Sequence, residues 1–211
     1  LEAQQQERET RHAALAKASL ARFAAAPTPA NLGYLFHPSY TITPSDLRKS
    51  ILTLAVQGRL TKPEVKLNTN KGSTPAQLND LDMNPFPIPH SWRWDSLGNI
   101  ARIERGGSPR PIKDFLTDEP DGLNWIKIGD TEKGGKFITS TKEKIRPDGL
   151  TKTRRVYPGD FLLTNSMSFG RPYITKIEGC IHDGWLRIHP PTELDPEFLY
   201  HLLSSSFVYE F

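Results

Sequence analysis

The residues of this chain that could act as catalysts form only incomplete motifs. His182 and Asp183 are adjacent and could serve as an acid–base pair, but neighbouring side chains in a strand point to opposite faces. A Pro-Asp pair at 147–148 could open a metal-dependent nuclease motif, yet no Glu-x-Lys follows at a plausible distance. The single cysteine, Cys180, excludes a disulfide framework and a multi-cysteine zinc site, and we expect it in the core. We therefore predict no catalytic centre and no metal site.

Motifs for phosphate binding and acyl transfer are incomplete as well. The glycine pairs at 106–107 and 134–135 lack the spacing and the Lys-Ser/Thr ending of a phosphate-binding loop. The segment 165–170, Asn-Ser-Met-Ser-Phe-Gly, is not the Gly-x-Ser-x-Gly elbow of a serine hydrolase. An enzyme with an unrecognised site is therefore the hypothesis that we rank last of three.

A set of polar and basic residues has the chemistry of nucleic-acid contact. Arginine can donate two hydrogen bonds to guanine, and lysine, arginine and serine contact phosphates. All members lie in or beside predicted turns, and loops held by a rigid sheet often present binding groups. The alternative interpretation is a solvated basic surface on an ordinary domain. The candidates for DNA contact are Ser108, Arg110, Lys133, Lys136, Lys152, Arg154, Arg155, Ser166, Ser168 and Arg171.

Charge and hydropathy narrow the class of protein. From Ile100 to Lys176 there are fifteen Lys/Arg and ten Asp/Glu, a difference of +5, whereas the whole chain has a net charge of only +3. The central region is therefore its more basic part. No apolar run approaches the roughly 20 residues that span a bilayer, and no signal-peptide pattern opens the chain. These features predict a cytoplasmic protein that does not enter a membrane.

The first 60 residues are predicted to be largely helical. Glutamine, glutamate, arginine and alanine dominate Leu1–Ala26, and no proline interrupts this segment. A second helix is predicted over Ser45–Gln57, with Ser45 or Asp46 as its N-cap and Gly58 at its C-terminal end. Its apolar residues are spaced to share one face, which could pack against a partner helix. The residues predicted to dock a partner are Leu47, Ile51 and Leu54.

A polar linker and a strand-rich domain are predicted to follow. Residues 61–90 are rich in lysine, asparagine, threonine and glycine, as linkers often are. Residues 91–211 alternate short β-branched or aromatic segments with turn signals and then return to a helical pattern at Pro196–Val208. The predicted fold class is α+β, a strand-rich domain preceded by helical segments. The predicted strands are Ile100–Ile103, Leu123–Ile128, Lys136–Thr139, Phe161–Thr164, Pro172–Ile177 and Trp185–His189.

Several motifs follow one another in a fixed order along the chain. The main ones are Asp46–Leu60 (DLRKSILTLAVQGRL), Pro87–Arg93, and Pro158–Leu163 followed by Ser166 and Gly170-Arg171. Further landmarks are Leu97-Gly98, Gly106–Pro109, Trp125–Asp130 and Leu194–Tyr200. This order resembles the DNA specificity subunit of type I restriction–modification systems. In that family the first motif resembles the helix that precedes a target recognition domain, the second the Leu-Pro-x-x-Trp segment, and the third the Gly-Asp-Ile-Leu…Ser…Gly-Arg signature.

This resemblance implies a division of labour. A specificity subunit carries two target recognition domains, each reading one half of a split double-stranded DNA target, and coiled-coil helical spacers set the gap between the halves. Methylation subunits, which hold S-adenosylmethionine, pack on those helices, and a restriction and translocation subunit joins for the cleavage that defends against phage. Residues 1–60 would be spacer and residues 91–211 a target recognition domain truncated at its C-terminus. The chain itself would bind no cofactor and catalyse nothing.

A second hypothesis is a regulatory or scaffold protein that acts through its helices and does not bind DNA. The basic loops would then be merely solvated. Salt dependence separates the two hypotheses, because DNA binding through phosphate contacts weakens steeply with added salt.

Overall fold

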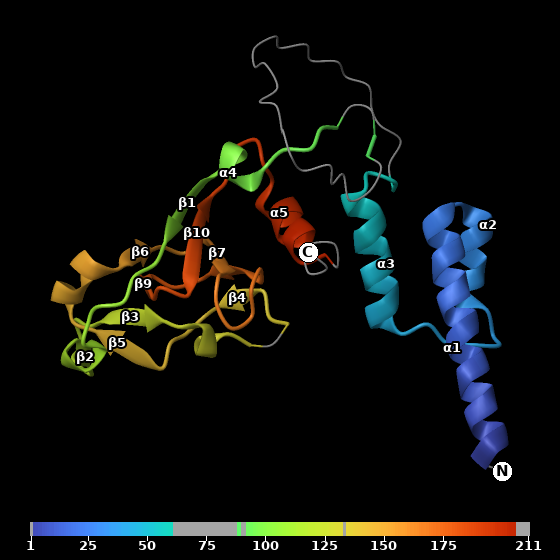
Figure 1. Cartoon of the computed structure of the whole chain (residues 1–211), viewed down its shortest axis with the longest axis horizontal. Helices are drawn as coiled ribbons and strands as arrows, with labels where there is room; N and C mark the ends of the chain where they lie inside the picture. The colour runs from blue at the N-terminus through green and yellow to red at the C-terminus, as the bar shows by residue number, and fades with distance from the viewer. Residues whose placement is uncertain (1, 61–87, 90–91, 133, 206–211) are drawn as a thin grey trace, which may run out of the picture. The chain divides into compact units, whose positions relative to one another are not determined.

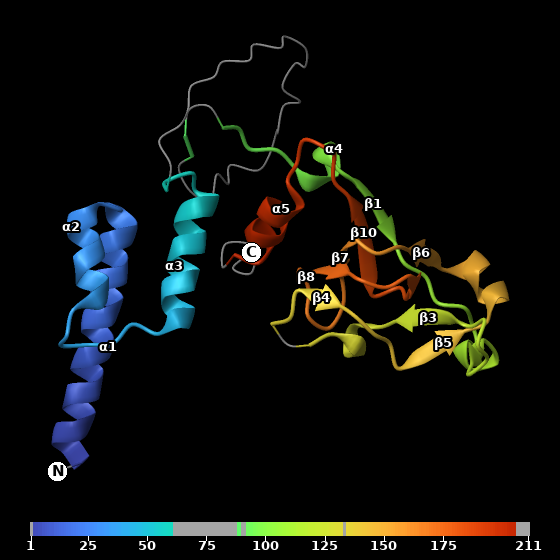
Figure 2. The same ribbon diagram turned by 180° about the vertical axis from the view of Figure 1, so that it is seen from behind.

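The computed structural model describes residues 2–60, 88–89, 92–132 and 134–205. These residues divide into two compact units, of which the first takes in the chain up to Trp94 together with Ser205, and the second spans Asp95–Ser204. The first unit is helical, and the second contains two β-sheets (Figure 1, and from behind in Figure 2). The predicted α+β class is therefore confirmed. The linker predicted for residues 61–90 falls almost wholly outside the described residues.

Helices build the first unit around a small apolar core. They are α1 (Glu2–Ala25), α2 (Pro29–Leu32), the 3-10 helix η1 (Gly33–Phe36) and α3 (Pro44–Val56). The alanine- and glutamine-rich α1 matches the predicted first helix. Its Phe23 is buried together with Leu35 of η1 and Leu54 of α3, so apolar contacts join these elements.

The two ends of α3 show how local sequence defines a helix. Its N-cap is Thr43, whose Oγ1 accepts a hydrogen bond from the Asp46 N–H at 3.1 Å. The prediction of Ser45 or Asp46 was wrong, because Pro44 opens the helix at a position where its missing N–H is not needed. The C-terminal end was predicted correctly. Gly58 follows the helix with φ of 67°, the left-handed conformation that glycine adopts without strain.

The apolar face of α3 is largely covered within the chain. Leu54 is fully buried in the core of the first unit, and Leu47 packs against the same core. Ile51, by contrast, is 40% exposed. Because α3 packs on α1 through this face, the fully buried Leu54 cannot dock a partner, which corrects that prediction. Leu47 is half-buried, and its docking role stays a prediction. Ile51 stays a candidate for partner docking.

Two five-stranded sheets form the second unit. The first sheet has the order β1 (Arg102–Arg105), β10 (Trp185–His189), β7 (Phe161–Thr164), β8 (Pro172–Thr175), β4 (Phe137–Ile138). The second has the order β2 (Leu116–Thr117), β5 (Glu143–Ile145), β3 (Leu123–Ile126), β9 (Gly179–Ile181), β6 (Arg154–Val156).

Neighbouring strands are antiparallel except for β4–β8 and β3–β9, which are parallel. Figure 1 shows β1 and β10 side by side, with β2, β3 and β5 grouped at one edge of the unit.

The main core of the second unit lies between these two sheets. Ile138, Leu162 and Trp185 come from the first sheet and Ile126 and Ile181 from the second, and all five are buried in one cluster. Burying an aliphatic or aromatic side chain of this size stabilises a fold by about 1.5–3 kcal/mol. The sheets therefore hold each other in place, and their connecting loops start from fixed ends.

The predicted strands are confirmed where the apolar pattern is strong. β7 and β10 have the predicted bounds. The prediction of Ile100–Ile103 was wrong at its start, because Leu97–Ile100 forms a short helix, α4, and β1 begins only at Arg102. Strands β2, β5, β6 and β9 were not predicted. They are short, and β5 and β6 are largely charged, so pairing with neighbouring strands specifies them more than their own sequence does.

The predicted C-terminal helix is present as α5 (Pro196–Leu203). Asp195 caps it, since its Oδ1 accepts hydrogen bonds from the N–H groups of Glu197 at 2.7 Å and Phe198 at 3.4 Å. α5 packs against β8. The predicted extension of this helix to Val208 lies outside the described residues.

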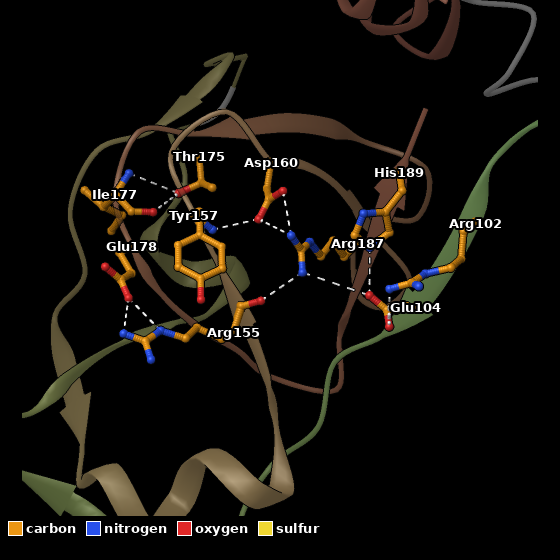
Figure 3. Close-up of polar contacts among 10 residues, drawn as sticks. All are labelled: Arg102, Glu104, Arg155, Tyr157, Asp160, Thr175, Ile177, Glu178, Arg187 and His189. Carbon is orange, nitrogen blue, oxygen red and sulfur yellow. Dashed lines mark hydrogen bonds and ion pairs between the residues drawn. The ribbon is translucent and has the colours of Figure 1, made fainter. Parts of the chain in front are cut away.

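A partly buried network of charges connects β1, β10 and the turn before β7 (Figure 3). Arg187 of β10 forms an ion pair with Asp160 at 2.8 Å and donates a hydrogen bond to the backbone oxygen of Arg155 at 3.1 Å. Glu104 of β1 lies 4.0 Å from Arg187 and 2.7 Å from Nε2 of His189. The hydrogen bond with His189 is the main cause that lowers the pKa of the Glu104 carboxyl. The folded state therefore favours ionised Glu104.

Replacing Glu104 with glutamine should lower the free energy of unfolding by about 1 kcal/mol near neutral pH. Because the pKa of Glu104 is lower in the folded state, its contribution is present above about pH 4.3 and is lost as the pH falls through the lowered pKa. Urea denaturation of wild type and Glu104→Gln from pH 7 to pH 3 should show a difference that shrinks below about pH 4.3.

The exposed Glu119 provides the control. Glu119→Gln should leave the free energy of unfolding unchanged across the same range. A constant difference between wild type and Glu104→Gln at every pH would contradict the role assigned to the ionised carboxylate.

Candidate nucleic-acid interface

Three loops of the second unit meet at one place. The loop 106–111 follows β1, the turn 182–184 joins β9 to β10, and the loop 165–170 joins β7 to β8. The Asn165 N–H donates a hydrogen bond of 2.9 Å to the backbone oxygen of Gly184 in this turn. The Gly106 N–H donates one of 2.9 Å to the backbone oxygen of Trp185, the residue that follows the turn. The turn therefore lies between the other two loops and fixes both.

The loop after β1 approaches its neighbours too closely for a side chain. A Cβ atom on Gly106 would lie 2.1 Å from the backbone oxygen of His182, and one on Gly107 would lie 2.4 Å from the backbone oxygen of Lys152. Lys152 ends the 3-10 helix η4 (Pro147–Lys152), so η4 is a fourth segment at this place. Glycine is needed at both positions because the neighbouring atoms are backbone and cannot rotate away.

Asp183 holds two of the residues predicted to contact DNA. Ser108 Oγ donates a hydrogen bond to its Oδ1 at 2.7 Å, and a guanidinium nitrogen of Arg110 lies 3.5 Å from its Oδ2. The hydrogen bond from Ser108 is the main cause that lowers the pKa of the Asp183 carboxyl. The Arg110 side chain is nevertheless 80% exposed. It is therefore oriented by a carboxylate while most of its donors face solvent.

An open cleft of about 830 Å³ lies beside this loop cluster. Trp125, Lys127, Glu143 and His182 line it together with residues of the loop 106–111. Lys127 and Glu143 form an ion pair of 2.8 Å across part of the wall. The lining of the cleft thus combines a largely buried tryptophan with charged and proline side chains.

His182 and Asp183 do not form an acid–base pair. Nδ1 of His182 accepts a hydrogen bond from the Gly184 N–H at 2.6 Å and lies 4.0 Å from Asp183. Burial lowers the pKa of His182, so the neutral ring is favoured. The two residues lie in a turn rather than in the strand that the sequence suggested. The sequence argued against a catalytic pair because adjacent residues in a strand face opposite ways. In the structure the reason is that the Gly184 N–H already occupies Nδ1 of His182.

Several other predicted residues lie at or next to the loop cluster. The Lys152 ammonium lies over the ring of Phe115, 4.9 Å from its centroid, and remains exposed. Ser166 packs against Gly184, where a Cβ atom would lie under 3.0 Å from Ser166 Oγ. Ser168 belongs to the loop 165–170, and Arg171 directly precedes β8. The structure therefore brings Ser108, Arg110, Lys152 and Ser166 together from three segments, which meet at the turn 182–184.

Other predicted residues are engaged elsewhere. Lys136 forms an ion pair with Glu197 of α5 and is only 22% exposed, and Arg155 forms one with Glu178, with 2.6 Å between Nε and Oε1. Arg154 and Arg155 lie in β6 rather than in a turn, which corrects the sequence-based placement. Arg154 is exposed. The candidate Lys133 lies outside the described residues.

Sequence reasoning did not identify Asp183 as the residue that positions Ser108 and Arg110. An Asp-Gly pair between two apolar runs is a strong turn signal, and Asp183-Gly184 carries it. No sequence signal pointed to Met167 and Phe169, which are 90% and 70% exposed in the loop 165–170.

The described side chains do not gather into a metal site, and the single thiol is buried. Within the described ranges, no group of three or more His, Cys, Asp or Glu side chains could hold a metal ion. Cys180 is fully buried, and burial raises its pKa to about 11, so the unreactive thiol form is favoured. None of the described helices is both long and apolar enough to cross a membrane.

Substituting Gly107 with alanine should displace the loop 106–111 and destabilise the second unit. We expect the thermal midpoint to fall by several degrees, since a Cβ atom there meets the backbone of Lys152. Gly129→Ala is the matched control, because a Cβ atom at Gly129 has nothing within 4 Å. If Gly107→Ala and Gly129→Ala unfold at the same temperature, the close packing described above is wrong.

This chain is similar to known proteins in sequence and in structure. No family model matches the chain. Over 171 residues it is 27% identical to the type I restriction enzyme EcoDI specificity subunit of Escherichia coli. The aligned region covers 76% of this chain and 35% of that protein. The chain thus spans about a third of the length of this curated relative.

Two solved structures are similar as well. The HsdS subunit from Thermoanaerobacter tengcongensis matches with 22% identity and a TM-score of 0.46 over 57% of this chain and 29% of its own. A chain from a structural study of type I R-M system assembly and conformational transition matches with 20% identity and a TM-score of 0.46, over 74% of this chain and 34% of its own. The curated relative confirms the resemblance that the motifs indicated: this chain is related in sequence to a specificity subunit of a type I restriction enzyme.

Proposed function

We propose that this chain is part of a sequence-specific DNA-binding subunit of a type I restriction–modification complex. The second unit would read one half of a split DNA target and would catalyse nothing itself. The observation that carries the proposal is the meeting of three segments at the turn 182–184, which brings Ser108, Arg110, Lys152 and Ser166 close together. The sequence similarity to a specificity subunit supports it.

The geometry suggests different roles within this surface. Arg110 is held by Asp183 and 80% exposed, which suits an arginine that aims two N–H groups at a base edge. Lys152 and Arg171 present positive charge from the ends of η4 and of the loop 165–170, as phosphate contacts require. Lys136 and Arg155 are paired with acids and would stabilise the fold rather than contact DNA.

The helical unit would act as spacer and docking surface for methylation subunits. Ile51 is 40% exposed on α3 and Leu15 is 40% exposed on α1, so apolar side chains remain available on both helices. S-adenosylmethionine would be held by those methylation subunits, and a restriction and translocation subunit would join them for cleavage. The scaffold hypothesis shares the docking role but has no use for the positioned Arg110.

Charge reversal at Arg110 and at Arg171 should weaken DNA binding without preventing assembly. In a complex of the full-length subunit with its methylation partner, we expect each variant to lower target affinity at least about tenfold. The double variant should abolish target methylation. It should also weaken the salt dependence of binding. The slope of the logarithm of the binding constant against the logarithm of the salt concentration should become smaller in magnitude by roughly one for each phosphate that the variant no longer neutralises. Fluorescence anisotropy across a salt series measures both the affinity and this slope.

Lys176→Glu is the matched control, because this exposed lysine follows β8 at the end opposite to Arg171. It changes the net charge equally but should leave affinity and methylation near wild type. Full methylation by the Arg110 and Arg171 variants would refute the site assignment.

Exchange of the whole second unit tests the function itself. Methylation of genomic DNA should be mapped in cells that express the full-length subunit with its methylation partner, and in cells where this region is replaced by another recognition domain. We expect a split motif in which only one half changes. An unchanged motif in a verified complex would favour the scaffold hypothesis.

A further inference from the structure

The loop 165–170 presents two large apolar side chains to solvent. Met167 is 90% exposed and Phe169 is 70% exposed, the highest values among the large exposed apolar residues of the second unit. They stand one residue apart at the tip of the connection between β7 and β8. Large apolar side chains that are exposed next to each other can mark an interaction site.

This tip is held in one shape by hydrogen bonds. The Thr164 hydroxyl donates to the backbone oxygen of Ser168 and accepts from the Arg171 N–H at 3.0 Å. The Gly170 N–H donates to the Thr164 oxygen at 2.9 Å, and Asn165 is bonded to the turn 182–184. Met167 and Phe169 therefore lie on a turn that hydrogen bonds define, and the conformation of that turn keeps both side chains exposed.

Backbone conformation gives a second, independent indication. Met167 has φ of 59°, the left-handed region that side chains other than glycine rarely adopt. The same loop uses a glycine at position 170, where φ is 75°. Folding alone would favour glycine at 167 as well, so methionine there indicates a use for its side chain.

The surroundings indicate what this tip contacts. Ser166, Ser168 and Arg171 flank the two apolar side chains, and the loop is bonded to the turn that carries Asp183 and orients Arg110. Hydroxyl groups and an arginine around a narrow apolar point suit a phosphate backbone with stacked bases behind it. A stable protein interface, by contrast, buries about 800 Å² on each partner, far more than two side chains on a turn provide.

We propose that Met167 and Phe169 form a wedge that enters double-stranded DNA between two neighbouring base pairs. This inference rests on the proposed DNA-binding function and adds a specific mode of contact. Apolar side chains inserted at a base step unstack it and bend the duplex, and the unstacking favours steps that deform easily. The wedge would therefore contribute to target choice without hydrogen-bonding any base.

The test uses the complex of the full-length subunit with its methylation partner. Duplex targets carry 2-aminopurine at successive positions of the half-site, and its fluorescence reports unstacking. We expect binding of the wild-type complex to change the fluorescence at one step, and the double variant Met167→Gly with Phe169→Ala to abolish that change and lower target affinity about tenfold. Glycine at 167 relieves the strained φ, so thermal stability should stay equal or rise.

Tyr157→Ala is the control, since Tyr157 is an aromatic residue 48% exposed in the turn that precedes β7, at the opposite end of that strand. It should keep the fluorescence change. An unaltered change in the double variant would overturn the wedge while leaving the proposed function intact. Loss of methylation-subunit binding by the double variant would overturn it in favour of a protein contact. A wild-type complex that binds no half-site would instead refute the proposed function and the wedge with it.

Discussion

The packing of backbone against backbone at Gly106 and Gly107 is the constraint on which the loop cluster depends. It joins the exit of β1 to the turn after β9 and to the end of η4, with no side chain between them. Because that turn also holds Asn165, a displacement at Gly106 would reach the loop 165–170. A single crossing of three chain segments therefore orients groups that are far apart in the sequence.

Acidic partners divide the basic residues into two classes. Glu178 and Glu197 form close ion pairs with Arg155 and Lys136, which fixes those cations within the fold. Asp183 acts differently, because its main hydrogen bond is with Ser108 and its distance to Arg110 is 3.5 Å. A carboxylate near DNA repels phosphate, but it also limits the orientations of an arginine, and a fixed orientation favours base reading over simple attraction.

Sequence reasoning succeeded where one local pattern determines the outcome. The apolar and aromatic residues of β10 and the helical pattern of Pro196–Val208 predict those elements directly. It failed for β6, since a strand beginning Arg154-Arg155 depends on pairing with β9, whose position no local pattern reveals. It also failed for the cation partners, because the contact of Arg155 with Glu178 depends on the same pairing. The loop residues were predicted as a group, but the bond network that orders them comes from the turn at Asp183.

Pairing of the first strand with the last has a consequence for how such a unit can be inherited. β1 lies at the edge of its sheet and pairs with β10, so residues at the two ends of the unit complete one surface. A genetic crossover between Arg105 and Trp185 would pair a β1 from one ancestor with a β10 from another. Glu104 and His189, which are hydrogen-bonded across these two strands, would then come from different ancestors as well. Recombination should therefore yield chains that fold when its breakpoints lie outside residues 102–189, so that the unit is inherited as one piece.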